Sequence, residues 1–180
     1  MKIGDILYFA PKIKFSDLDL SGQKLPEQFD SRIRGFYLEP AKNLAQNGHA
    51  FASGLVLVSC IDALSRLQSK SKAGVRRRFC AWVENELPSF HSPAIAGRFY
   101  DEFRNGLVHE ARIKKGGQFS LEQSSTVDTA SGVLSINPMR LAKEVYVALQ
   151  RYVATLKGRP TACQDLLARL KTDFKYELAP

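Results

Sequence analysis

The sequence contains few of the residues, and none of the motifs, that mark most enzyme classes. Its three cysteines and three histidines in 180 residues form no metal-spaced cluster, and the cysteines are not an even set for disulfides. A phosphate-binding glycine loop, a His-Glu-x-x-His motif and a nucleophile elbow are also missing. We therefore expect no metal, no organic cofactor and a reducing, cytoplasmic environment.

Segments that would direct the chain to a membrane are missing as well. Asp5 interrupts the apolar residues near the N-terminus, which argues against a signal peptide. The apolar run at 50–61 is shorter than the roughly 20 residues that span a bilayer. The sequence therefore predicts a soluble protein with no membrane partner.

The chain does contain enough apolar sequence for a core, and it has an excess of basic residues. Hydrophobic residues make up 44% and charged residues 24% of the chain, which is typical of one compact domain over 1–180. The net charge of +8 favours a polyanionic partner such as RNA, although many basic proteins bind no polyanion.

Apolar periodicity predicts an all-α fold with a small β-hairpin. An extended arm at 1–28 comes first, and a helix broken or kinked by Pro40 follows. The segment 49–68 is apolar on nearly every side, which is typical of a central buried helix, and Asp62 within it needs a basic group or helix-end amides as partner. Alternation at 117–136 predicts a small β-hairpin or meander on the surface. Further helices are expected at 75–87, 92–112, 138–157 and 161–174.

The stretch 92–112 concentrates the chemistry that can be interpreted. Ser92 and Pro93 suit a helix start, and an apolar stripe follows at helical spacing: Ile95, Phe99, Phe103 and Leu107. The opposite side carries a polar row: Arg98, Glu102, Asn105, His109 and Arg112. Gly106 lies between the two at a cost of roughly 1 kcal/mol relative to alanine, which predicts that something approaches the helix closely there.

Within this stretch, Arg104-Asn105-x-x-x-His109 resembles the Arg-Asn-x-x-x-His motif of the HEPN superfamily. HEPN domains are all-α and typically pair as homodimers through the helix that carries the motif. Many are metal-independent endoribonucleases of toxin, defence and RNA-processing systems. The resemblance covers roughly residues 31–157 as architecture, and only Arg104, Asn105 and His109 as chemistry.

The resemblance implies roles for the three motif residues. RNA is cleaved without metal when its own 2′-hydroxyl attacks the adjacent phosphate, which requires a base, an acid and positive charge. Arg104 would stabilise phosphate charge, His109 would transfer protons, and Asn105 would orient the substrate or the imidazole. In one helix Arg104 and His109 point about 140° apart, so they act together only if the cleft curls around the helix or a second subunit completes the site.

Neighbouring residues are expected to support the site. Glu102 can pair with a residue one turn away, Gly106 gives a second motif helix close access, and Asp62 of the central helix is expected to pair with Arg104. The Arg76-Arg77-Arg78 triplet is either a solvated helix start or a surface for phosphates. Four basic residues form a rim for substrate: Arg98, Arg112, Lys114 and Lys115.

Three interpretations of the sequence stay open. The first is a dimeric endoribonuclease of a toxin or defence system, with RNA as substrate and an antitoxin or other neutralising protein as a partner. The second is a non-catalytic module that binds RNA, a nucleotide or a protein, and the third is a purely structural helical protein. In one antitoxin-regulated branch of the family a tyrosine two residues after the histidine is modified, and Ala111 at that position argues against this regulation.

Overall fold

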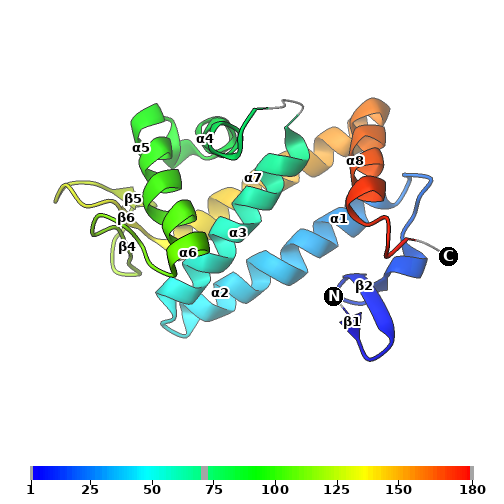
Figure 1. The fold of residues 1–180 in the computed structure, drawn as a ribbon, viewed down its shortest axis with the longest axis horizontal. Coiled ribbons are helices and arrows are strands. Elements are labelled where there is room, and N and C mark those ends of the chain that lie inside the picture. Colours follow the sequence, from blue (N-terminus) through cyan, green and yellow to red (C-terminus); the bar gives the residue numbers. More distant parts are fainter. Residues whose placement is uncertain (1, 70–72, 179–180) are drawn as a thin grey trace. The chain divides into compact units, whose positions relative to one another are not determined.

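The computed structural model describes residues 2–69 and 73–178, which are mostly helical with two small β-sheets (Figure 1). The expectation of an α-rich fold is confirmed. Two compact units make up the chain: a terminal unit of Met1–Tyr37 with Leu149–Pro180, and a central unit of Leu38–Ala148. All residues of the predicted site lie in the central unit, and the expectation of one domain over 1–180 stays a prediction.

The terminal unit begins with a three-stranded antiparallel sheet, where the sequence predicted only an extended arm. The sheet and the helix start at Leu25 show that the arm prediction over 1–28 was wrong in detail. The elements of this unit are β1 (Lys2–Ile3), β2 (Ile6–Ala10), β3 (Ile13–Lys14), a 3₁₀-helix (Phe15–Asp17), α1 (Leu25–Ile33), the end of α7 (Pro138–Gly158) and α8 (Pro160–Asp173).

An arginine closes the core of the terminal unit. Arg32 lies over three aromatic rings, 5.0 Å from the centroids of Phe9 and Phe174 and 5.5 Å from that of Phe36. Its guanidinium also donates a hydrogen bond to the carbonyl oxygen of Phe9. Burial lowers the pKa of Arg32 below its ordinary value. These cation–π contacts tie α1 to β2 and to the chain that follows α8.

The central unit is built from helices around one small sheet. The break expected at Pro40 takes the form of a π-helical segment, Arg34–Leu38, directly before α2, and Pro40 lies in the first turn of α2, where its missing N–H is tolerated. The helices of this unit are α2 (Glu39–Gln46), α3 (Ala50–Gln68), α4 (Val75–Glu86), a 3₁₀-helix (Pro88–Phe90), α5 (Pro93–Arg98), a π-helical segment (Phe99–Arg104), α6 (Asn105–Glu110) and the start of α7.

Aromatic side chains form a continuous row through the core of the central unit. Phe99 lies 5.5 Å from Phe79 and 4.8 Å from Phe90, measured between ring centroids. Phe103 continues the row, 5.6 Å from Phe99 and 5.0 Å from Phe119. Aromatic pairs at such separations stabilise a core beyond their buried area. The row therefore fixes the 99–103 region against α4 on one side and the sheet on the other.

The residues 117–136 form a three-stranded sheet and not only a hairpin. β5 (Val127–Asp128) and β6 (Ser135–Ile136) are antiparallel around the expected turn, whereas β4 (Gln118–Phe119) pairs with β6 in parallel. The turn at 128–132 is exposed, as expected of a surface feature, but Leu134 and Ile136 are fully buried and the ring of Phe119 packs against Gly54 of α3. The sheet is thus part of the core that supports 99–103.

α3 differs from what the sequence predicted in two respects. It is 19 residues long, and by length and composition it could cross a membrane, so the length argument drawn from the run at 50–61 does not hold. In the structure 44% of the apolar window is buried, and a core helix of a soluble protein meets the same criteria, so this observation is weak evidence for a membrane span. Phe51 and Leu55 are 49% and 36% exposed, so α3 is not buried on every side.

Candidate functional site

The motif residues lie on one helical stretch with an irregular centre. α5, the π-helical segment and α6 follow one another without a break, and we call the whole stretch 93–110 the motif helix. Within it the N–H of Asn105 donates to the carbonyl oxygen of Tyr100, five residues back, so the turn is wider than in an α-helix. The apolar stripe is kept, because Phe99, Phe103 and Leu107 are all buried. The helix starts after Ser92 as predicted, although the Ser92 side chain makes no capping hydrogen bond.

Three neighbours hold the guanidinium of Arg104. Nη2 donates to Oδ2 of Asp62 on α3 at 3.1 Å, and Cζ lies 5.5 Å from the ring centroid of Tyr100. Nη1 lies 3.3 Å from Nε2 of His109. The side chains of Arg104 and Asp62 are 12% and 33% exposed. The pair of Asp62 and Arg104 that the sequence predicted is therefore present in a partly buried setting.

The contact between Arg104 and His109 corrects the prediction that these residues point too far apart to act together within one helix. Arg104 stands at the end of the wide π-helical turn, and its long side chain spans the remaining gap. Because a guanidinium can only donate, we infer that Nε2 of His109 accepts and that the neutral ring carries its proton on Nδ1. No second subunit is needed to bring this pair together.

The close approach predicted at Gly106 is present, but the approaching backbone belongs to the same chain. Ala111 ends the helix with a left-handed φ of 53°, and the chain turns back. Arg112 N–H then donates to the carbonyl oxygen of Gly106 at 3.3 Å, and Lys114 N–H donates to that of Glu102 at 2.9 Å. A Cβ on Gly106 would overlap the carbonyl oxygen of Arg112. The glycine is therefore explained by the turn at 111–114, and the inference that it admits a second subunit was wrong.

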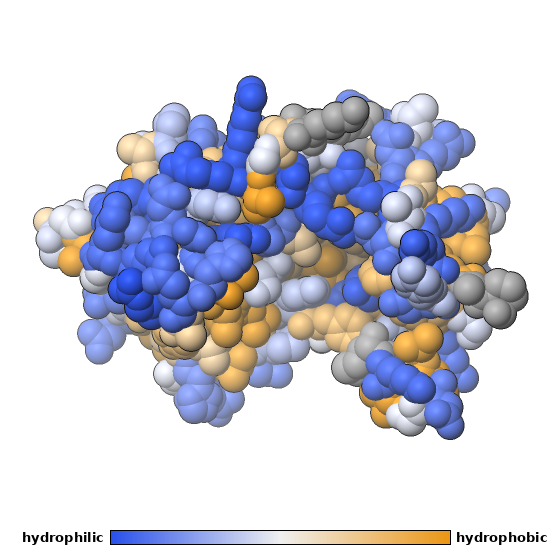
Figure 2. All heavy atoms as spheres, viewed as in Figure 1, coloured by the Kyte–Doolittle hydropathy of each residue, from blue (hydrophilic) through white to orange (hydrophobic). Residues whose placement is uncertain are grey.

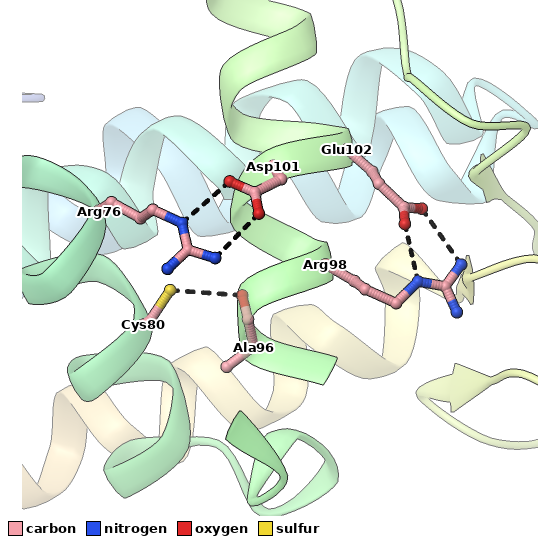
Figure 3. A network of polar contacts seen from close by, with 6 residues as sticks. All are labelled: Arg76, Cys80, Ala96, Arg98, Asp101 and Glu102. Carbon is pink, nitrogen blue, oxygen red and sulfur yellow. Dashed lines mark hydrogen bonds and ion pairs between the residues drawn. The ribbon is translucent and has the colours of Figure 1, made fainter. Parts of the chain in front are cut away.

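Arg98 and Glu102 form a brace on the side of the motif helix that faces the small sheet (Figure 3). Arg98 Nε donates to Glu102 at 2.7 Å, and Arg98 Nη2 donates to the carbonyl oxygen of Gly132 at 3.1 Å. The hydrogen bonds to Glu102 raise the pKa of Arg98 above its ordinary value. Glu102 is only 1% exposed, so it supports the fold and is not part of an exposed polar row. Arg98, predicted to bind substrate, is committed to these two partners.

The other predicted rim cations lie just after the motif helix. Arg112 pairs with Glu110 at 2.7 Å, and Lys114 pairs with the same carboxylate. The hydrogen bond from Lys114 is the main reason that the pKa of Glu110 lies below its usual value. Lys115 is exposed and forms no ion pair with any residue in 2–69 or 73–178. Much of the positive charge predicted at this rim is therefore balanced within the protein.

Asn105, the remaining motif residue, is half-buried on the first turn of α6. Its side chain makes no hydrogen bond within the described part of the chain, which distinguishes it from Arg104 and His109. Its amide is therefore available to a ligand. On the face drawn in Figure 2, hydrophilic residues gather over α5 and α6.

Sequence reasoning missed a second arginine beside the motif helix. Arg76 of α4 donates two hydrogen bonds to Asp101, at 3.0 and 2.9 Å, on the opposite side of the motif helix from Glu102 (Figure 3). Arg76 Cζ also lies 6.0 Å from the ring centroid of Tyr100, the ring that contacts Arg104. The partners are 25 residues apart in sequence, so only helix packing reveals this pair. The basic triplet at 76–78 was the one signal that pointed to it.

No family model, curated protein or solved structure matches this chain. The geometry of the motif helix and its neighbours therefore carries the functional argument.

The turn at 111–114 predicts opposite effects for two small substitutions. Gly106→Ala should lower the free energy of unfolding by about 1–3 kcal/mol, because the new Cβ overlaps the Arg112 carbonyl oxygen. Ala111→Gly should raise it by about 0.5–1 kcal/mol, because glycine adopts a positive φ without steric cost. Denaturant unfolding followed by circular dichroism measures both, and changes of the same sign would contradict this description of the turn.

The pair of Asp62 and Arg104 should show measurable coupling in a double-mutant cycle. Exposed pairs contribute about 0–1 kcal/mol and breaking a buried pair costs about 3–5 kcal/mol, so we expect a coupling of about 1–3 kcal/mol for this partly buried pair. The variants are Asp62→Ala, Arg104→Ala and the double variant, compared by free energy of unfolding. The matched control is the exposed pair Glu27 and Lys157, which should couple by less than about 1 kcal/mol. Equal coupling in the two cycles would show that partial burial adds nothing.

Proposed function

We propose that the central unit is a HEPN-like domain and that the protein is a metal-independent endoribonuclease of a toxin or defence system. The observation that supports this most directly is the contact between Arg104 and His109, with Asp62 behind it. The contact places a positive charge, on the partly buried Arg104, next to a proton-transferring group, on the exposed His109, which is what cleavage by the RNA 2′-hydroxyl requires.

Each side chain at this point has a distinct task in the proposed reaction. Asp62 engages Nη2 of Arg104 and directs Nη1 toward His109, where a phosphate oxygen would become its new partner. Nε2 of His109, released from Arg104, would accept the proton of the attacking 2′-hydroxyl. The unengaged amide of Asn105 would orient the ribose or the phosphate. The attacking oxygen forms the bond to phosphorus as the bond from phosphorus to the 5′-oxygen breaks, and a second, protonated imidazole would donate a proton to the leaving 5′-oxygen.

A second copy of the chain would supply what one His109 cannot. The same imidazole cannot act as base and as acid in one concerted step, whereas a two-fold dimer presents two copies of His109 in one cleft. Val108 precedes His109 on α6 and is 49% exposed, so its side chain offers an apolar contact beside the motif. This exposed valine replaces Gly106 as the reason to place the dimer at α6.

One observation favours a non-catalytic RNA-binding module as the second candidate. Arg104 contacts Asp62, Tyr100 and His109, and its Nε is buried without a hydrogen-bond partner among the described residues. A guanidinium engaged in this way is suited to bracing α6 against α3. In this case substitution of Arg104 would reduce stability, and RNA would bind without being cleaved.

The ribonuclease proposal predicts cleavage of labelled RNA that continues in the presence of a chelator and leaves a 2′,3′-cyclic phosphate. His109→Ala should reduce the rate at least about 100-fold, because general acid–base catalysis contributes about that much or more. His49→Ala is the matched control, since His49 is an exposed histidine outside the motif helix and should retain wild-type activity. An unchanged rate in His109→Ala would remove the nuclease assignment, and RNA binding without cleavage by the wild type would favour the second candidate.

The dimer proposal predicts that a charge at position 108 separates the subunits. Val108→Asp should shift the protein toward monomer in sedimentation velocity and reduce cleavage with it, because the aspartate would be buried between two copies. Val147→Asp on α7 is the matched control, since Val147 is 54% exposed and lies outside the motif helix. A wild-type monomer at micromolar concentration that still cleaves RNA would show that one chain suffices.

A further inference from the structure

The basic triplet at the start of α4 separates into three side chains with different surroundings. Arg76 is bound to Asp101, and Arg78 donates to the carbonyl oxygen of Ala73 at 3.0 Å. Arg77 is exposed and makes no hydrogen bond or ion pair with any residue that the structure describes. A solvated helix start would explain why Arg77 is exposed, but it would not explain the two hollows in the surface beside it.

Arg77 lies between two hollows in the surface of the central unit. The first has a volume of about 360 Å³ and is also lined by Arg78, Trp82 and Gln68. The second has a volume of about 620 Å³ and is also lined by Arg76 and Tyr100. Both volumes fall in the range of small-ligand sites, so each hollow is large enough for a nucleotide. Arg77, which has no ion-pair partner among the described residues, therefore lines both hollows.

The second hollow is connected to the candidate site through one aromatic ring. Tyr100 lines the hollow, and its ring centroid lies 6.0 Å from Arg76 and 5.5 Å from Arg104. Arg104 in turn contacts His109. Arg76 and Arg104 thus contact the same ring, and Tyr100 links the triplet to the motif.

We propose that the triplet is a phosphate-binding surface for single-stranded RNA, which holds the nucleotides next to the one at His109. The proposal rests on the proposed function, because it takes RNA as the ligand. Arg77 makes the first phosphate contact, and Arg76 makes a second when it exchanges Asp101 for phosphate. Guanidiniums suit this task because they bind phosphate oxygens in a bidentate manner.

Substitution of Asp101 distinguishes a phosphate-binding role of Arg76 from a purely structural role. Hydrogen bonds from Arg76 hold the pKa of Asp101 below its usual value, so the carboxylate is charged at neutral pH and competes with phosphate for Arg76. Asp101→Asn removes this competition and should tighten RNA binding. If the pair only braces α4 against the motif helix, Asp101→Asn should change affinity no more than Asp128→Asn does, because both substitutions remove one negative charge and Asp128 is an exposed carboxylate of the central unit that lines neither hollow.

The test is fluorescence anisotropy with a labelled 2′-O-methyl RNA strand, which cannot be cleaved, measured over a series of salt concentrations. Arg77→Ala should weaken binding and lower the slope of log Kd against log salt by about 0.7, the value for one phosphate contact in a single strand. Asp101→Asn should lower Kd. Arg140→Ala is the matched control, because Arg140 is an exposed arginine of the central unit that lines neither hollow and should bind like wild type.

The outcomes separate this proposal from the nuclease proposal. Binding that responds to Arg77→Ala and Asp101→Asn as stated supports the surface, even if the wild type cleaves no RNA. Cleavage by the wild type together with unchanged binding in Arg77→Ala would overturn the surface and leave the nuclease proposal standing. Tight binding of polyglutamate, lost in Arg77→Ala, with no binding of RNA would also overturn it, since the partner would then be an acidic peptide.

Discussion

A guanidinium that is mostly removed from water needs a counterion, and Asp62 meets this need for Arg104. The pair joins α3 to the end of the π-helical segment. Because Asp62 takes one end of the guanidinium, the other end is directed at His109. The orientation of Arg104 toward the motif histidine therefore depends on a carboxylate from a different helix.

The irregular centre of the motif helix is compensated by the turn that follows it. A wide turn changes which main-chain groups can pair within the helix, and the carbonyl oxygen of Glu102 accepts a hydrogen bond from Lys114 N–H. That hydrogen bond is possible because Gly106 has no side chain to block residues 112–114. The π-helical segment thus depends on Gly106 and on the left-handed Ala111. Together the three features fix the end of α6, where His109 lies.

Local pattern was sufficient to predict part of this site. The spacing of Phe99, Phe103 and Leu107 predicted the buried stripe, and a lone carboxylate in the most apolar helix predicted the pairing of Asp62 with Arg104. The π-helical turn could not be predicted, because it depends on hydrogen bonds with the later turn, and the role of Gly106 was misassigned for the same reason. The parallel pairing of β4 with β6 likewise depends on packing between residues distant in sequence.

The distribution of paired charge changes how the net charge of +8 should be understood. Next to the motif, most cations have a carboxylate partner: Arg104 pairs with Asp62, Arg98 pairs with Glu102, and Glu110 pairs with both Arg112 and Lys114. Arg77 has no such partner among the described residues. Ion pairs keep side chains in fixed positions, which catalysis needs, whereas an unpaired cation attracts a polyanion over a distance. Affinity and chemistry would then reside in different parts of one surface, and each could change by substitution without loss of the other.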